Sequence, residues 1–388
     1  MDTGAQTPEW PFDGQYPSRL VHLHAFVNYA LSPYWERDWE ENLLRGSGVR
    51  ITVGSITSRD FLTDAVVSVN EPLGDTRFRF VYRMDWLEAM HVEVSEVRQM
   101  AGFEMALIGP VGLQALIQPT GDKEFMDMAF GLVVADRGRE RYLRAALRFD
   151  DIVWADKNDR AGTYARRPLA LDWTARHAAG AFELFTEGLL SRRWERAFPD
   201  TTASPAISAE RRGVSRATVR ARYHTRRAAF AEVELTWYDF EDAQAWRDAS
   251  ESYGYRNRIV TLRGRYAFTF RDGRWRAWPG VQLLLQDATA SGRRDYGFDR
   301  IDWMPSAFVE WRASPAHAIE VGYMSSVSDR TLVDADPAAS FDESTYTDKI
   351  KLGWTYEFTS TSRLQISLSH ELAFDKFGGG NVQFMTFF

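Results

Sequence analysis

Arginines and glutamates at alternating positions are the side chains of this sequence with the clearest chemical potential. They fall on short runs in which polar and apolar residues alternate: Arg216, Arg220, Arg222, Glu232, Glu234, Arg263, Arg265, Arg271, Arg274 and Arg276. A guanidinium carries five N–H donors and can hold a carboxylate or phosphate through two of them at once. The chemistry that these rows predict is the recognition of charged groups, anions above all.

Two interpretations of these rows stay open. In the first, the arginines and glutamates pair across neighbouring strands and only satisfy a wet interior. In the second, they set up a transverse electric field, with Glu232 and Glu234 on the strand between two arginine rows. The five arginines of residues 263–276 exceed the acids that can reach them. This segment therefore predicts the binding of an anionic ligand from outside the chain.

Metal binding and catalysis have weaker support. His22 and His24 lie two residues apart and could present two imidazoles to a metal, but the sequence places no third ligand, so we interpret them as polar interior residues. No histidine has a companion serine in a nucleophile motif, and His224 lies close to Arg220 and Arg222, whose charge weakens a general base. The sequence has no cysteine, which excludes thiolate metal sites and haem attached through Cys-x-x-Cys-His. We expect no enzyme activity and no cofactor.

Strands with one apolar face must position these charges. In residues 260–270 the side chains of Leu262 and Phe268 point to one face, and those of Arg263 and Arg265 point to the other, because successive side chains of a strand face opposite ways. A turn at Asp272-Gly273 follows, and the same alternation resumes after it. The sequence therefore predicts hairpins with one apolar and one charged face.

Residues 381–388 add a resemblance to a known group of proteins. Val382, Phe384, Thr386 and Phe388 alternate on one face, and the sequence ends in phenylalanine. This segment resembles the assembly signal of Gram-negative outer-membrane β-barrels, whose last strand ends in Phe or Trp. Through the hairpin pattern the resemblance covers nearly the whole chain. It implies a location in the bacterial outer membrane, contact with its lipid and lipopolysaccharide, and the barrel-assembly machinery as a partner.

The predicted fold class is all-β: a transmembrane antiparallel up-and-down β-barrel of about 18–20 strands, with short periplasmic turns and longer extracellular loops. We expect the barrel over residues 19–388, after a polar N-terminal segment at 1–18. Residues 20–31 would form the first strand, and residues 48–72 would form one strand or two, which leaves the strand count open. The long connections are expected at residues 156–166, 191–213, 239–254, 287–300 and 331–345.

Composition agrees with this fold and argues against others. The mean hydropathy is −0.38 and we find no 18-residue apolar run, so no transmembrane helix is expected, whereas alternating strands keep the average low. A β-propeller would repeat a motif roughly every 40–50 residues, and none is found. No signal peptide precedes Asp2, which we interpret as a mature chain restarted with Met1. The net charge of −7 argues against nucleic acid as a partner.

Two functions follow from a barrel with a charged interior. An arginine facing lipid at the midplane costs about 2–4 kcal/mol, so the charged rows should line the lumen. The first hypothesis is a channel for small hydrophilic or anionic solutes, narrowed by an inward-folded loop at residues 191–213. This loop carries Arg192, Arg193, Arg196, Arg211 and Arg212.

The second hypothesis is a sleeve or scaffold in a trans-envelope complex, for polysaccharide export or electron conduction, with a partner protein inside. A homo-oligomer is compatible with either function. A third hypothesis, an outer-membrane hydrolase, has no nucleophile motif to support it.

Overall fold

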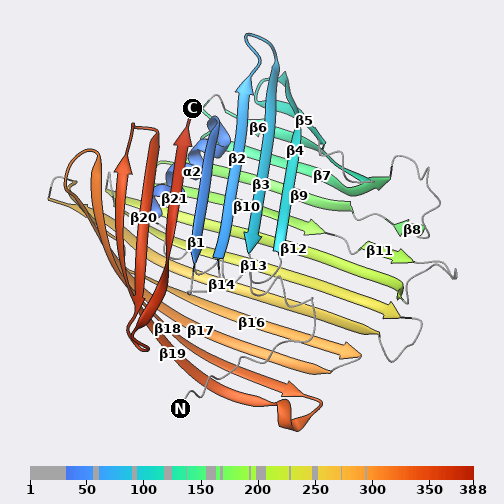
Figure 1. Ribbon diagram of the computed structural model, residues 1–388. Helices are drawn as coiled ribbons and strands as arrows, with labels where there is room; N and C mark the ends of the chain where they lie inside the picture. Colours follow the sequence, from blue (N-terminus) through green and yellow to red (C-terminus); the bar gives the residue numbers. More distant parts are fainter. Residues whose placement is uncertain are drawn as a thin grey trace.

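The computed structural model describes residues 32–55, 61–89, 94–117, 125–136, 138–153, 163–166, 169–191, 194–197, 207–226, 229–246, 252–271, 273–292 and 295–388. These residues form a closed antiparallel β-barrel of 18 strands around one α-helix (Figure 1). The segment at 1–18 and the expected first strand at 20–31 lie outside the described residues. No helix in the described ranges is long and apolar enough to span a membrane.

Eighteen strands make up the wall: β1 (Gly48–Ser55), β2 (Phe61–Pro72), β3 (Phe78–Ala89), β4 (Val94–Ile108), β5 (Val111–Ile117), β6 (Phe125–Ala135), β7 (Arg141–Val153), β9 (Leu169–Ala179), β10 (Phe182–Ser191), β12 (Ile207–Arg226), β13 (Ala229–Trp246), β14 (Tyr253–Phe270), β16 (Gly280–Gly292), β17 (Tyr296–Arg312), β18 (His317–Asp334), β19 (Phe341–Glu357), β20 (Ser362–Glu371) and β21 (Lys376–Phe387). Three short strands continue these: β8 (Thr163–Arg166) extends β9, β11 (Trp194–Ala197) extends β10, and β15 (Trp275–Ala277) extends β16.

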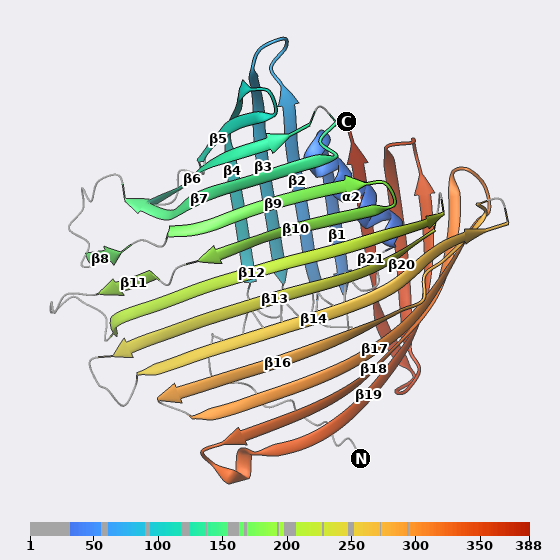
Figure 2. The same cartoon turned by 180° about the vertical axis from the view of Figure 1, so that it is seen from behind.

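The first and last strands close the barrel. β1 pairs antiparallel with β21, from Gly48 opposite Phe387 to Ser55 opposite Gly380. The tilted strands surround the helix in both views (Figures 1 and 2). The predicted fold class is confirmed, and the strand count among the described residues is 18, because residues 48–72 form two strands, β1 and β2.

The two faces of the wall differ as the alternation predicts. On β13, the side chain of Val233 faces outward and is 53% exposed, whereas its neighbour Glu232 faces inward and is 2% exposed. Outward apolar side chains recur on every part of the wall, such as Leu132, Leu262 and Leu352. This is the architecture of outer-membrane β-barrels, as the sequence predicts, and it points to the bacterial outer membrane.

The two ends of the barrel also differ. At the end where Phe388 lies, tight turns connect the strands, such as the one at Gly180 between β9 and β10. Gly180 has a φ of 60°, a left-handed conformation that suits glycine. We call this the short-turn end. The opposite end carries longer connections, including the one between β18 and β19 with the 3₁₀ turn η3 (Pro337–Ala339).

Several segments expected to be long loops are largely strands. β13 runs on to Trp246 and β14 begins at Tyr253, so most of residues 239–254 belongs to the wall. The same holds for residues 287–300 and 331–345. The apolar alternation stops there because the outward face has left the lipid, but the backbone ladder continues. Ion pairs on the outer face, such as Arg258 Nη2 to Asp287 Oδ1 at 2.6 Å, replace the apolar contacts.

Candidate functional site

Helix α2 (Pro33–Arg45) lies inside the lumen at the short-turn end and leads directly into β1. Its sequence favours a helix, since Pro33 takes the first turn and Glu36 brings an acid to the positive end of the helix dipole. The helix ends at Gly46, whose N–H donates to the carbonyl of Asn42 at 2.9 Å. Asn42 Nδ2 then donates to the Ser47 carbonyl at 2.9 Å and fixes the exit of the helix toward β1.

Two tryptophans hold one side of α2 against the seam of the barrel, by which we mean the β1–β21 pair. Trp35 and Trp39 are buried with Val66 of β2 and Met385 of β21. The ring of Trp39 also stacks on Phe387, with centroids 6.1 Å apart. Burial of a large apolar side chain stabilises a structure by roughly 1.5–3 kcal/mol. These contacts fix the helix to the wall independently of any charge.

The ends of α2 are packed as well. Leu44, near its C-terminus, is buried with Val133 of β6 and Phe185 of β10. Tyr34, in its first turn, meets the ring of Phe230 of β13 edge-on at 5.5 Å. The helix is therefore anchored along its length against opposite parts of the wall.

Glutamates on the other side of α2 meet the arginine rows. Glu36 accepts hydrogen bonds from both terminal nitrogens of Arg263, each at 3.3 Å, in a two-pronged contact. It also accepts from Nη2 of Arg265. Both arginine side chains are 4% exposed. The anion that meets Arg263 and Arg265 in this structure is a carboxylate of the chain itself.

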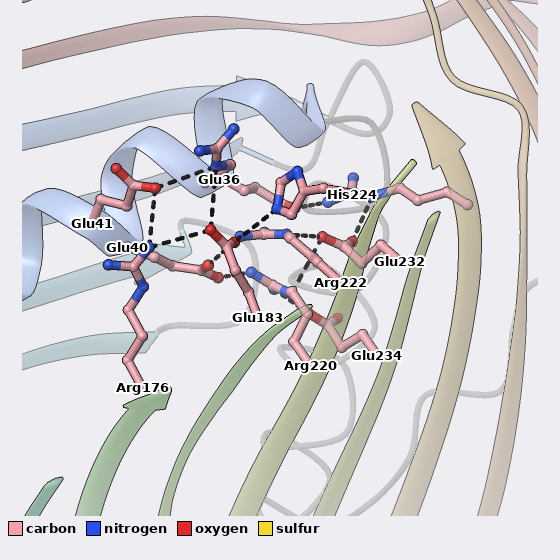
Figure 3. Close-up of polar contacts among 12 residues, drawn as sticks. Glu36, Glu40, Glu41, Arg176, Glu183, Arg220, Arg222, His224, Glu232 and Glu234 are labelled. Carbon is pink, nitrogen blue, oxygen red and sulfur yellow. Dashed lines mark hydrogen bonds and ion pairs between the residues drawn. The ribbon is translucent and has the colours of Figure 1, made fainter. Parts of the chain in front are cut away.

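Two further glutamates extend this contact across the wall (Figure 3). Glu40 accepts from Arg222 Nη1 at 2.8 Å and forms an ion pair with Arg220. Glu41 accepts from Arg176 Nη2 of β9 at 3.1 Å. The spacing of Glu36 and Glu40 is one helical turn, which places both on one face of α2.

The wall supplies its own glutamates between the arginine rows. Glu232 and Glu234 of β13 each lie opposite one arginine of β12 and one of β14, in two rows of three: Arg222–Glu232–Arg265 and Arg220–Glu234–Arg263. Glu232 accepts from Arg222 Nε at 2.5 Å and from Arg265 Nε at 2.6 Å. In β12, β13 and β14 the arginines and glutamates therefore pair across neighbouring strands, as the first interpretation of the sequence predicts.

Wall and helix have complementary charge. The wall brings five arginines to this contact, at positions 176, 220, 222, 263 and 265, against the three carboxylates of Glu183, Glu232 and Glu234. The excess is two positive charges. The helix brings three carboxylates and the guanidinium of Arg37, an excess of two negative charges. Each surface therefore neutralises the other, and either one alone would hold uncompensated charge.

The pKa values of two helix residues reflect this environment. Burial alone would raise the pKa of Glu36, but the nearby guanidiniums of Arg263 and Arg265 outweigh it and lower the pKa to about 2. Burial raises the pKa of the Tyr34 hydroxyl to about 12, against a smaller opposing effect of Arg276. Glu36 is thus ionised, and Tyr34 neutral, over the whole physiological range.

The remaining arginines of the predicted rows lie apart from this contact. Arg216 is exposed on β12, opposite Tyr238 of β13. Arg271 and Arg274 are exposed in the turn between β14 and β15. Arg276 of β15 faces the lumen, where it donates to Glu310 Oε1 at 3.3 Å. The structure therefore divides the predicted cluster of residues 263–276 among a helix contact, a turn and a separate lumenal position.

Other predicted residues are placed as follows. Val382 and Phe388 face outward on the last strand and are 44% and 69% exposed, and Phe384 shares their face. His22 and His24 lie outside the described residues.

The prediction that residues 191–213 form a loop folded into the lumen is wrong for the residues of this segment that the structure describes. β11 pairs with β12 from Trp194 opposite Arg212 to Ala197 opposite Ala209. These residues, Arg196 and Arg211 among them, therefore continue the wall and do not fold inward as a loop, because their backbone ladder is satisfied by the neighbouring strand. Arg192 and Arg193 lie outside the described residues.

Sequence reasoning missed the helix and its acids. Its residues Glu36, Glu40 and Glu41 belong to no alternating pattern, so a search for strands passes over them. Two signals were present: a proline that follows Ser32, and pairs of tryptophans and glutamates four residues apart. Such a pattern predicts a helix with one aromatic and one acidic face. Arg176, near the end of β9, was also missed, because its partner Glu41 lies on this helix.

No protein-family model and no curated protein matches this chain. Among solved structures, the chain is similar to the trimer form of OmpT, an outer-membrane protein of Vibrio cholerae, with 11% identity over 88% of this chain and 98% of that one and a TM-score of 0.40. It is similar to a bacterial polysaccharide outer membrane secretin, with 10% identity over 89% and 99% and a TM-score of 0.43. It is also similar to OccAB3 of Acinetobacter baumannii, with 7% identity over 88% and 98% and a TM-score of 0.42. Likeness at this level concerns the general barrel fold alone.

Proposed function

We propose that this protein is an outer-membrane channel for small hydrophilic or anionic solutes, and that α2 narrows its lumen at the short-turn end. The observation that carries the proposal is a helix held inside a closed, charged barrel by ion pairs and by buried tryptophans. The proposal takes the apolar outer face to contact membrane lipid and lipopolysaccharide, and the barrel-assembly machinery to insert the chain. It assigns transport and no catalysis.

The width of the barrel supports a channel. Barrels of about 16–18 strands leave an interior too wide for side chains alone to fill. Here part of that interior is taken by α2, whose Trp35 and Trp39 are 3% and 5% exposed. A solute must therefore pass beside the helix, along a wall that carries charged and amide side chains.

The packing of α2 favours the role of a fixed constriction and argues against that of a mobile plug. Displacing the helix would expose two tryptophans at roughly 1.5–3 kcal/mol or more each and would take the Glu36 carboxylate away from the buried Arg263 and Arg265. Breaking one partner of a buried ion pair costs about 3–5 kcal/mol. The helix therefore narrows the pore and stays in place during transport.

The sleeve hypothesis has less support in this arrangement. A partner protein threaded through the barrel needs the full cross-section of the lumen. At the short-turn end α2 contacts β2, β13 and β21 together, and so takes up space that such a partner would need. A sleeve would also leave the charge match between helix and wall without a purpose.

Single-channel recording tests the proposal. The purified barrel in a planar bilayer should give steady openings, since a wide aqueous pore conducts ions. Glu40→Gln removes a carboxylate that is 10% exposed and bound to two arginines, which should loosen α2 and give larger, fluctuating openings. Asp287→Asn is the matched control, because it removes one carboxylate from an exposed pair on the outer face.

Three outcomes separate the possibilities. Steady openings that Glu40→Gln enlarges and Asp287→Asn leaves unchanged support a pore narrowed by the helix. Equal currents from all three proteins would refute the constriction. A correctly folded barrel that passes no current would refute the channel and favour a sleeve, whose partner would then be sought by co-purification.

A further inference from the structure

A polar cavity lies beside α2 at the short-turn end, between the helix and the β14–β20 part of the wall. Its volume is about 320 Å³, at the lower end of the range for small-molecule sites. Its lining comes from the first turns of α2, from the wall and from the turn between β19 and β20: Tyr34, Arg37, Asp38, Thr269, Arg276, Arg312, Glu357, Thr359, Ser360 and Arg363. Four of these residues are arginines.

Aromatic rings and carboxylates fix two of the four guanidiniums. Arg276 lies over the ring of Tyr34, 4.6 Å from its centroid, and donates to Glu310 at 3.3 Å. Arg363 lies over the ring of Trp35 at 4.9 Å and donates to a carboxylate of α2 at 2.6 Å. Stacking and charge together restrain each side chain, so neither has to be ordered when a ligand arrives.

The other two guanidiniums come from opposite sides of the cavity. Arg312 of β17 donates to Glu357 and lies 3.6 Å from Glu310 through Nε. Arg37 of α2 donates through Nε to Glu41 at 3.2 Å. The exposed fractions of these two side chains are 27% and 33%, so both reach the solvent in the cavity.

The arginines hold donors in reserve. Within the described residues, each of the four side chains donates a hydrogen bond to a single carboxylate, whereas a guanidinium has five N–H groups. Two of the partner carboxylates, Asp38 and Glu357, belong to the cavity lining, and two, Glu41 and Glu310, lie behind it. Each guanidinium therefore keeps N–H donors for an anion in the cavity.

Hydroxyl groups complete the lining. Thr269 lies on the wall, and Thr359 and Ser360 lie in the turn between β19 and β20. A hydroxyl both donates and accepts hydrogen bonds, so this side of the cavity suits the hydroxyls of a polar solute. The complete set matches a molecule with one anionic group and several hydroxyls.

We propose that this cavity is a binding subsite for a small solute that carries a carboxylate or a phosphate group. The inference rests on the proposed channel and names the class of solute for it. It moves the anion site from the Arg263 and Arg265 pair, which Glu36 occupies, to the cavity on the far side of α2. Of the arginines that the sequence singled out, Arg276 is the one that belongs to it.

Titration calorimetry of the full chain, folded in detergent micelles, tests the subsite. The probes are potassium glucuronate, inorganic phosphate and, as the uncharged match to glucuronate, glucose. We expect one saturable site for glucuronate or phosphate, whichever fits better, and no saturable heat with glucose. Arg312→Gln should weaken binding about tenfold, because it removes a charge-assisted hydrogen bond. Arg258→Gln, on the outer face, is the control and should bind as the unmodified chain does.

A second variant guards against loss of folding. Ser360→Asp adds a carboxylate to an exposed turn residue without removing any ion pair, and it should also weaken binding about tenfold or more. Anion binding that both variants leave unchanged would overturn the subsite, as would glucose binding as tightly as glucuronate or no binding by either anion. A barrel that conducts ions but binds no probe would refute the binding subsite and leave the channel proposal intact. A barrel that binds a probe but does not conduct would refute the channel proposal alone.

Discussion

The ionisation of Glu36 couples the position of α2 to pH. Its pKa is about 2 with the helix docked, against 4.5 for an unperturbed glutamate. Because docking lowers this pKa, the stabilisation is complete above about pH 4.5 and is lost as the pH falls toward 2, by about 1.4 kcal/mol per pH unit. We expect conductance to be constant from about pH 7 to about pH 5 and to rise below that.

Conductance recorded over this pH range checks the expectation, and Glu36→Gln is the control. The variant has no carboxylate at position 36, so its conductance should already be higher and its acid-dependent rise should be smaller. An increase in the unmodified channel already at nearly neutral pH would contradict the assignment of the acid response to Glu36.

At the residue scale, the sequence could predict which side chains face the lumen but not what they meet. Strand alternation places Glu232 and Arg265 on the same face as surely as it places Val233 on the other. It cannot show that Glu36 fills the space between Arg263 and Arg265, because residue 36 is more than two hundred positions away and lies on a helix. The wall does carry more arginines than glutamates at this contact, but the glutamates that balance them lie on α2, far away in the sequence.

At the element scale, the tryptophans predict how α2 is retained. Trp39→Ala removes a side chain that is 5% exposed, at a cost of about 3–5 kcal/mol. The population with α2 released should rise by about a hundredfold or more. Limited trypsin digestion, with cleavage after Arg37 or Arg45, measures that population.

The control for this experiment is Trp303→Ala, the same substitution on the outer face, where Trp303 is 51% exposed. It should leave cleavage in α2 unchanged. Equal protection of α2 in both variants would show that the ion pairs alone hold the helix, and that the aromatic contacts add little.

The elements themselves were only partly predictable. Alternation located the hairpins where the wall faces lipid, because there every second residue must be apolar. Beyond the lipid, β13 and β14 continue with charged outward residues such as Arg256, whose Nη2 donates to Asp239 Oδ2 across the strand pair at 2.8 Å. Charged pairs of this kind resemble the composition of a loop, so the sequence placed the strand ends too early.

At the scale of the whole molecule, the last residue provides a separate test of assembly. The side chain of Phe388 is 69% exposed on the outward face, so Phe388→Ser should cost the finished barrel no more than the roughly 1.5–3 kcal/mol of one buried phenylalanine and should leave it folded. If the machinery recognises this side chain, the same substitution should strongly reduce the amount of barrel inserted in cells. Membrane fractionation measures insertion, and refolding into micelles measures stability.

The two measurements must diverge for the expectation to hold. Normal insertion of Phe388→Ser would show that the terminal aromatic is not read as an assembly signal. A matched substitution at the other end of the same strand, Phe377→Ser, changes a side chain that is 49% exposed and should insert normally.

The contacts between α2 and the last strand also bear on the order of folding. β1 and β21 come from opposite ends of the described chain, so among the described strand pairs theirs closes the longest loop and is entropically the least favourable to form. The helix and the segment that follows it also contact β21: Trp39 stacks on Phe387, Trp35 and Trp39 share a buried cluster with Met385, and the Ser47 carbonyl accepts from the N–H of Phe388 at 3.0 Å. Contacts of this kind, if they formed first, would shorten the loop that the strand pairing has to close. The element that we propose to narrow the finished pore would thus also assist the closure of the barrel during folding.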